Sequence, residues 1–284
     1  MFSRERHIDS IHPTIGDVLN FLSQLYSSGL GYSSINLAKS ALSTILTVHQ
    51  YEKLSSHPLI KRFMKGVFNS KPPVPRYSVI WDLGQVLTYI RNMGEDQTLS
   101  LKHLTHKVAA LMMILSAQRV NYISSLSIKA MQMTPDSCTF YPTKLLKHSR
   151  PSFLGKPIVF KAYPADSKLC IVTTLTEYLH RRAQLTDVDQ LLVTFIKPHG
   201  PAHHDTIARW LKNILQWAGI DITQFKAHSY RAASTSYAQT VQVPVTDILQ
   251  QGQWKSEKTW QKYYNLPCQA PSASSTFATN ILQQ

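Results

Sequence analysis

The chain has 284 residues, enough for two domains and a sizeable core, and 43% of them are hydrophobic, which excludes a wholly disordered protein. Its 30 Lys and Arg residues against 16 Asp and Glu residues give a net charge of +14. Such an excess attracts polyanions and favours nucleic acid as a partner, although a basic protein without such a partner would show the same balance.

Three further features argue against a secreted or membrane protein. No apolar run approaches the roughly 20 residues that a helix needs to cross a bilayer. The first residues, M-F-S-R-E-R-H, lack a signal-peptide core and begin abruptly, as expected of a piece cut from a longer polyprotein. The cysteines Cys138, Cys170 and Cys268 are far apart and odd in number, which predicts reduced thiols in an intracellular protein.

The first 70 residues are predicted to form a small helical bundle. Apolar side chains recur at helical spacing over residues 14–26 and again over 35–46. A third helix, over 57–68, carries three cations that we expect to face solvent: Lys61, Arg62 and Lys65. The prolines of K-P-P-V-P-R-Y then hold the chain extended, which predicts a domain linker over 71–80.

Helices and one hairpin are predicted after the linker. Two helices follow it, and the second brings Arg119 to its C-terminal side. Between residues 139 and 160, two β-like runs flank the basic turn K-H-S-R-P-S-F-L-G-K, which predicts a hairpin with cations at its tip. A generic solvated hairpin would show the same pattern. The candidate phosphate contacts here are Lys144, Lys147, Arg150 and Lys156. Further helices are expected over 171–182, over 205–218 and from about His228.

Several histidines raise the question of a metal site. His199, His203 and His204 lie in one stretch, but they lack an acidic or Cys partner at helical spacing and stand among Pro and Gly. His103 and His106 lie three positions apart and also lack such a partner. The sequence therefore predicts no metal site.

The stretch A-His228-S-Y-Arg231-A-A-S indicates phosphodiester chemistry. A His and an Arg three positions apart lie on one face of a helix, so both can reach one small anion. A Tyr can attack phosphorus while Arg, His and Trp groups bind the oxygens and a Lys protonates the leaving alkoxide. Each residue also has an ordinary alternative: His-x-x-Arg occurs often by chance, Trp254 can be an aromatic core plug, and Tyr263 and Tyr264 can pack a helix.

The order Arg, hairpin Lys, His-x-x-Arg, Trp, Tyr resembles the catalytic domain of tyrosine recombinases, the phage-integrase family. The resemblance covers essentially the whole chain. The phrase W-K-S-E-K-T-W-Q-K-Y-Y-N-L-P and the run L-C-x-V-x-x-L-x-x-Y-L around Cys170 look most similar to the eukaryotic transposon branch, of the DIRS/Ngaro or Crypton type.

The resemblance implies a mainly α fold with a small β-sheet or hairpin, in two domains. Residues 1–70 would form a helical core-binding domain, one half of a clamp around DNA, and 71–80 the linker. Residues 81–267 would form the α+β catalytic domain. The tail over 268–284 would dock on a neighbouring protomer, although its sequence alone is equally compatible with docking in cis or with disorder.

Six side chains take catalytic roles if the resemblance holds: two phosphate clamps, a general acid for the 5′ leaving oxygen, an acid/base, an indole donor and the nucleophile. In that order these are Arg119 and Arg231, Lys147, His228, Trp254 and Tyr264. Tyr263 is the alternative nucleophile, because it stands nine positions after Trp254 as in many bacterial members. We prefer Tyr264, because the eukaryotic phrase T-F-x-x-F-Y aligns Tyr263 with a phenylalanine.

One position departs from the family pattern. Many members carry an acidic residue three positions after the first Arg, where it buttresses the site, and this chain has Tyr122 there. That departure keeps open a DNA-binding protein of the same fold that has lost activity. A type IB topoisomerase-like nicking enzyme, which uses the same chemistry on one duplex, is a second alternative.

The activity implied is strand cleavage through a 3′-phosphotyrosyl intermediate, followed by rejoining to a partner strand, as in integration of a mobile element. The bond energy is kept in the covalent link, so neither ATP nor metal nor another cofactor is expected. The partners would be double-stranded DNA, at element termini or a target site, and further copies of the chain in dimers and tetramers. No membrane partner is expected, and a eukaryotic DNA substrate places the protein in the nucleus.

Overall fold

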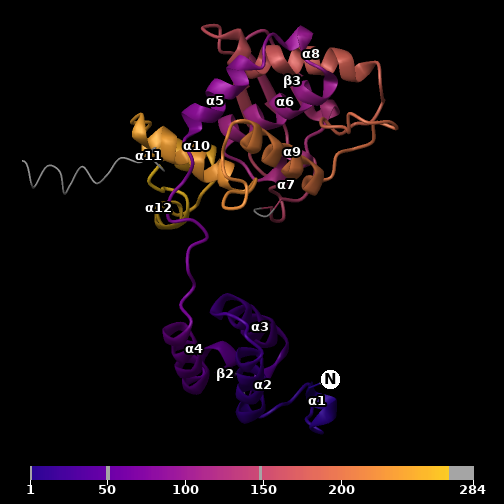
Figure 1. The fold of residues 1–284 in the computed structure, drawn as a ribbon. Helices are drawn as coiled ribbons and strands as arrows, with labels where there is room; N and C mark the ends of the chain where they lie inside the picture. Colours follow the sequence, from indigo (N-terminus) through magenta and orange to yellow (C-terminus); the bar gives the residue numbers. More distant parts are fainter. Residues whose placement is uncertain (1, 49–51, 147–148, 269–284) are drawn as a thin grey trace, which may run out of the picture. The chain divides into compact units, whose positions relative to one another are not determined.

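A computed structural model describes residues 2–48, 52–146 and 149–268. The chain divides into two compact units, Met1–Arg76 and Tyr77–Gln284. Each unit is described by itself, and Figure 1 shows the elements of both. Lys147 and the predicted tail from residue 269 onward lie outside the described residues.

The first unit is a small helical bundle. In chain order it contains α1 (Phe2–Glu5), α2 (Ile15–Ser27), α3 (Tyr32–Ile45), the two-residue strands β1 (Thr47–Val48) and β2 (Glu52–Lys53), a 3-10 turn (Leu54–Ser56) and α4 (Pro58–Ser70). Thr14 begins α2 with a capping box: its side chain accepts from the Asp17 N–H while the Asp17 carboxylate accepts from the Thr14 N–H. Leu22, Ile35 and Ile60 are fully buried between the three long helices.

The second unit holds the predicted helices and a three-stranded antiparallel sheet. Its elements are α5 (Leu83–Asn92), α6 (Leu101–Ser116), α7 (Val120–Ser124), β3 (Met131–Met133), β4 (Ser137–Phe140), β5 (Ile158–Lys161), α8 (Ile171–Ala183), α9 (His204–Trp217), α10 (Ser229–Thr240), α11 (Val245–Gln251) and α12 (Glu257–Tyr263), with 3-10 turns at Asp96–Thr98, Ile128–Ala130 and Ser167–Leu169. The strand order is β3-β4-β5. The sequence predicted the β4 and β5 runs but not β3.

Helix α6 is the centre of this unit. It packs against α8, α9 and α10, and nearly every residue from Leu104 to Ile114 is buried. The one lysine in that stretch, Lys107, is also buried, and it forms an ion pair with Asp96 at 2.7 Å. A helix that is covered on all sides places its C-terminal end accurately, and that end leads to Arg119.

The linker is shorter than predicted. The second unit begins at Tyr77, and Tyr77 and Ile80 are both buried in its core. The Ile80 N–H donates to the Pro267 carbonyl at 2.9 Å, so the start of the unit lies beside its last described residues. The extended stretch thus covers little more than the prolines themselves.

Two class predictions can be compared with this structure. The predicted mainly helical fold with a small sheet is confirmed. Among the described helices, none combines the length and hydropathy needed to cross a bilayer.

Candidate active site

The first predicted site residue stands at a sharp turn after α6. Ala117 adopts a left-handed conformation with φ 49°, which ends α6, and Arg119 then caps the start of α7. Two reciprocal hydrogen bonds hold this turn against α11: Gln118 donates to the Gln251 carbonyl at 2.6 Å, and Gln251 donates to the Leu115 carbonyl at 2.7 Å. The segment that presents Arg119 is thereby tied to the segment that leads to Trp254.

Two hydrogen bonds through the buried Ser229 anchor the start of α10. Trp81 donates its indole N–H to Ser229 Oγ at 2.7 Å, and Ser229 donates to the Lys226 carbonyl at 2.6 Å. Ser229 is fully buried, and the preceding residue, His228, occupies the N-cap position of α10. This anchoring places His228 and Arg231 on the first turn, as their spacing predicted.

Arg231 is the most unusual side chain of the site. It is 1% exposed, and its Nη2 donates to the Gly252 carbonyl at 2.6 Å. Its Nε and Nη1 find no hydrogen-bond partner among the described residues. Burial, and secondarily the charge of Arg119, lower its pKa to about 9. A buried guanidinium in this condition is costly unless an anion joins it.

Trp254 lies on the Arg231 guanidinium. The Arg231 Cζ is 3.7 Å from the indole centroid, a stacked cation–π arrangement. The indole also covers Gly252, where a Cβ would come within 1.6 Å of the ring, so no larger residue fits there. The indole Nε1 is buried and has no partner among the described residues, although the residue as a whole is only half-buried, so Trp254 offers an unused donor beside Arg231.

The two adjacent tyrosines differ sharply in position. Tyr264 follows α12, its hydroxyl lies 3.5 Å from His228 Nε2, and its ring contacts both Trp254, at 4.9 Å between centroids, and the Arg231 guanidinium, at 5.1 Å. Tyr263 is 50% exposed and contacts Lys262 instead. Figure 1 shows α10, α11 and α12 gathered at one side of this unit. Of the predicted set, these elements bring His228, Arg231, Trp254 and Tyr264 together.

Comparisons with known proteins agree with this geometry at the level of fold. No protein-family model matches the chain, and no curated protein matches its sequence. Solved structures do match. One is the Tn1549 transposon integrase in complex with transposon right end DNA, with a TM-score of 0.63 and 11% identity over 97% of this chain and 85% of that chain. The chain has the tyrosine-recombinase fold.

Two further structures with this fold are similar to the chain. XerH site-specific recombinase bound to palindromic difH substrate, in a post-cleavage complex, has a TM-score of 0.56 and 14% identity, over 87% of this chain and 67% of that chain. A lambda integrase tetramer bound to a Holliday junction has a TM-score of 0.51 and 14% identity, over 88% and 64%. These structures give the eukaryotic transposon branch no support, and that finer assignment stays a prediction.

The hairpin of the tyrosine-recombinase fold carries the other predicted cations. Lys144, Arg150 and Lys156 are all exposed on the long connection between β4 and β5, and Arg150 lies 5.5 Å from the Phe153 ring. Lys147, the predicted general acid, lies outside the described residues. Tyr122, the departure from the family pattern, is 4% exposed and donates to the Lys156 carbonyl at 2.6 Å.

The predicted cations of the first unit line a shallow groove. Lys61 and Lys65 border a cavity of about 460 Å³ on α4, whereas Arg62 is exposed beside it. Lys39 of α3 lies on the same cavity and was missed, because nothing in the sequence indicates that α3 and α4 pack side by side. These three lysines make this face of the bundle positively charged.

A second basic surface was missed altogether. A cavity of about 640 Å³ lies between the start of α6, the loop after Val193 and α9, and its lining includes four cations and no carboxylate. The cations are Lys102, Lys197, Arg209 and Lys212. They are spread over more than 100 positions of the sequence, so no local run of charge signals the patch.

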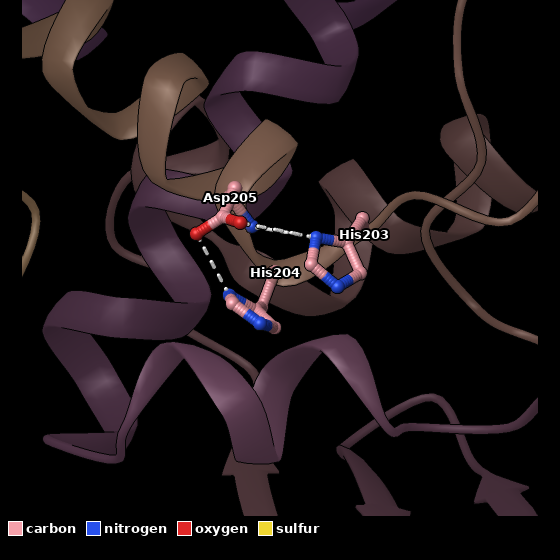
Figure 2. Close-up of side chains that lie close together, drawn as sticks. All are labelled: His203, His204 and Asp205. Atoms are coloured by element: carbon pink, nitrogen blue, oxygen red, sulfur yellow. Dashed lines mark hydrogen bonds and ion pairs between the residues drawn. The ribbon is translucent and has the colours of Figure 1, made fainter. Parts of the chain in front are cut away.

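The histidines at the start of α9 have an acidic partner after all, in the adjacent residue rather than at helical spacing. Figure 2 shows Asp205 in contact with both His203 and His204. Its two carboxylate oxygens lie 3.3 Å from His203 Nδ1 and 3.0 Å from His204 Nδ1. Among the described residues, this is the one trio of such ligands close enough to hold a metal ion. His203 and Asp205 are exposed and His204 is half-buried, both histidines contact Asp205, and His203 caps α9.

The remaining histidines considered in the sequence, His199 and the pair His103 and His106, each contact a protein group. His103 contacts Ser100 at 3.1 Å, and His199 contacts the Thr194 carbonyl at 2.9 Å. His106 is fully buried between the Lys102 carbonyl, at 2.7 Å, and Asn213, at 3.2 Å. Burial lowers its pKa to about 4, so it is neutral at neutral pH.

Proposed function

We propose that this chain cleaves and rejoins DNA strands as a tyrosine recombinase. Tyr264 attacks the scissile phosphate to form a 3′-phosphotyrosyl link and releases a 5′-hydroxyl. A 5′-hydroxyl of a partner strand then attacks the phosphotyrosine and releases the tyrosine again. Each step exchanges one phosphoester for another, so no external energy source enters the balance.

The observation that carries this proposal is the buried Arg231 with two unpartnered nitrogen donors. A guanidinium binds two phosphate oxygens through parallel N–H groups, and in a buried site such charge-assisted bonds are strong. Trp254 adds an unpartnered indole donor beside it, and Arg119 is near enough to act on the charge of Arg231. Donors that are already in place stabilise the charge that develops on a pentavalent phosphorane without reorganisation.

The surroundings of Tyr264 support its role as the nucleophile. Its hydroxyl lies 3.5 Å from His228 Nε2, within reach of proton transfer once a substrate tightens the site. Adjacent helical positions point about 100° apart, so Tyr263 and Tyr264 cannot share one role. We assign Lys147 the proton transfer to the 5′ oxygen, on the strength of its place in the motif alone.

Double-stranded DNA is the proposed partner. The net charge of +14, the cationic groove of the first unit and the cationic cavity beside α9 all favour a polyanion. The exposed hairpin cations Lys144, Arg150 and Lys156 add phosphate contacts near the site. Because the similar lambda integrase was solved as a tetramer on a Holliday junction, we propose assembly into dimers and tetramers on DNA.

The biological context of the activity, which includes the kind of element and the cellular location, is also a proposal. A mobile element is the natural context, since one similar structure is a transposon integrase. The DIRS/Ngaro or Crypton assignment and a nuclear location rest on the local phrase around Tyr264. The substrate would then be the termini of the element or its target site.

The test is covalent capture. Nicked duplexes with randomised arms, which lose a short fragment on cleavage and cannot be resealed, are incubated with the protein, and covalent complexes are precipitated with SDS and potassium. Mass spectrometry of the adduct peptide is expected to find the nucleotide on Tyr264, and Tyr264→Phe to abolish the adduct. The matched control, Tyr263→Phe, is expected to keep it.

Other outcomes point elsewhere. An adduct on Tyr263 would keep the enzyme and change the nucleophile. Salt-sensitive DNA binding without any adduct would leave a binding protein of this fold. Processive relaxation of a single supercoiled plasmid, without strand exchange between two duplexes, would indicate a nicking enzyme of the type IB topoisomerase kind.

A further inference from the structure

Three segments that carry residues of the proposed site meet at one backbone oxygen, the carbonyl of Lys156. The Tyr122 hydroxyl donates to it at 2.6 Å, and Gln253 Nε2 donates to it at 3.5 Å. Tyr122 belongs to α7, which begins directly after Arg119. Gln253 stands between Gly252 and Trp254, and Lys156 ends the hairpin connection. A carbonyl oxygen has two lone pairs, so it can accept both donors at once.

Tyr122 is held at both of its ends. Its backbone N–H donates to the Arg119 carbonyl at 2.9 Å, and its hydroxyl reaches Lys156. The side chain is 4% exposed, and burial raises the pKa of its hydroxyl to about 12, so the proton that it donates stays in place at any working pH. A packed aromatic ring with few rotatable bonds therefore links the Arg119 backbone to the hairpin.

The described part of the hairpin connection is cross-linked within itself. Ser149 Oγ accepts from the Leu146 N–H at 2.7 Å and donates to the Leu154 carbonyl. Leu146 packs closely on Gly155, where a Cβ would come within 2.8 Å of its Cδ1. Because these contacts tie Leu146, Ser149, Leu154 and Gly155 together, the anchor at the Lys156 carbonyl sets the position of these described residues, which we call the hairpin arm.

The geometry points to Tyr122 as a positioning residue, which aligns the hairpin arm with the helix that follows Arg119 and with the turn that carries Trp254. The inference rests on the proposed strand-cleavage function. Gln253 is the weaker member of the same device, since its contact is longer and its side chain is more exposed. We assign Tyr122 no contact with substrate, so it acts only through its hydrogen bonds to the Lys156 and Arg119 backbone.

Tyr178 offers a matched control for a lost hydroxyl. It is also fully buried, and its hydroxyl donates to the Leu191 carbonyl at 3.3 Å and accepts from the Val193 N–H at 3.1 Å. Tyr178 lies on α8 and both partners lie in the loop after it, in the same unit but not in the segments that meet at Lys156. Tyr122→Phe and Tyr178→Phe thus each remove one buried hydroxyl from the same unit.

The experiment measures three quantities on the full chain: the single-turnover rate of covalent adduct formation, the Kd for the same DNA, and the Tm. Tyr122→Phe is expected to slow cleavage about tenfold or more at an unchanged Kd, because a small misplacement of catalytic groups is felt mainly in the reacting complex. Tyr178→Phe is expected to lower the Tm at least as much and to cleave at the wild-type rate. Cleavage by Tyr122→Phe within twofold of wild type would overturn the inference. Equal slowing by both variants would do the same.

A double variant tests whether the two donors act through one carbonyl. Gln253→Met keeps the length of the side chain but removes its donor, and it is expected to slow cleavage about twofold to threefold. Two residues that act independently would slow cleavage in the double variant by the product of their separate fold decreases. If both donors act through the Lys156 carbonyl, the measured decrease will differ clearly from that product. A simple product would mean that the residues act independently, against the inference. If the wild type forms no adduct at all, the proposed function falls and this inference with it, whereas a fast Tyr122→Phe removes the inference alone.

Discussion

Two buried cations in the second unit have opposite surroundings. Lys107 on α6 is fully buried and pairs with Asp96 at 2.7 Å, and Thr174 donates to the second oxygen of that carboxylate at 2.9 Å. Arg231 on α10 is equally buried, but it faces a second cation, and two of its nitrogens lack a partner among the described residues. The first charge is neutralised within the protein, and we propose that a bound phosphate neutralises the second.

A third buried basic group, in contrast, carries no charge at neutral pH. His106 is held between a backbone carbonyl and Asn213, and its lowered pKa makes it neutral. These three groups are thus buried in three ways: Lys107 by pairing, His106 by losing its charge, and Arg231 with its charge in place at the proposed phosphate site. The cost of the third way is what a bound phosphate relieves.

The largest expected effect comes from removing the unpartnered charge. Arg231→Met is expected to lower the rate of covalent adduct formation by about 10³-fold or more, because a buried donor to the reacting phosphate is lost. The Tm should change little, since the apolar side chain avoids the cost of a buried charge. If Arg231→Met instead lowered the Tm strongly and cleaved DNA normally per folded molecule, Arg231 would be a structural cation, and its contrast with Lys107 would be wrong.

The opposite pattern is expected at Lys107. Lys107→Met leaves the Asp96 carboxylate buried and unpaired, so the free energy of unfolding should fall by about 3–5 kcal/mol. Denaturant titration measures this, and cleavage per folded molecule should be unchanged. The double variant with Asp96→Asn should regain at least half of the loss, because the uncompensated charge is gone. A cost below about 1 kcal/mol for Lys107→Met would show that this pair is not the neutralising element that its geometry indicates.

The neutral His106 predicts a specific dependence of stability on pH. Its pKa is about 4 in the folded protein, against 6.5 ordinarily, so the unfolded chain binds the proton more readily between these values. Stability from this residue is therefore complete above pH 6.5 and is lost as pH falls toward 4, by about 3 kcal/mol in total. Denaturant titrations across this window measure the loss. His106→Gln should flatten the slope there, and an unchanged slope would assign the effect to other groups.

The smallest effect should come from a simple anion. Inorganic sulfate is a tetrahedral oxyanion like the phosphodiester, and at five times its Kd it should stabilise the wild type by about 1 kcal/mol. Thermal unfolding with sulfate, against sodium chloride at equal ionic strength, measures the effect. Arg231→Met should lose the difference, whereas Lys107→Met should keep it. An equal gain in all three proteins would reflect a general salt effect on stability.

The comparison of Tyr263 with Tyr264 shows where local sequence reasoning ends. Two alignments of the same phrase favoured different residues, and spacing alone could not separate them. Packing separates their positions: Trp260 is buried and sets the rotation of α12, which leaves Tyr263 half-exposed and turns Tyr264 toward Arg231 and His228. The rotation of α12 depends on contacts with other elements, which cannot be read from the local sequence.

Elements with a strong local signal were predicted well. Apolar periodicity indicated α2, α3, α6, α8 and α9, and the prolines marked the boundary between the units. Strand β3 was missed, because three residues of mixed polarity carry no β signal of their own and pair only with β4. The same limit hid the cationic cavity beside α9, whose lysines and arginine come from three separate segments.

Periodicity, together with the resemblance to tyrosine recombinases, was enough to predict the fold class, because helix formation and motif spacing are local properties. The set of groups for a phosphodiester site stays a prediction. Distances between groups far apart in the chain were not predictable in this way. The link from Tyr122 to Lys156, the stacking of Trp254 on Arg231 and the pairing of Lys107 with Asp96 exist because distant segments pack together. Those contacts decide which buried charge has a partner within the protein and which keeps donors without one among the described residues.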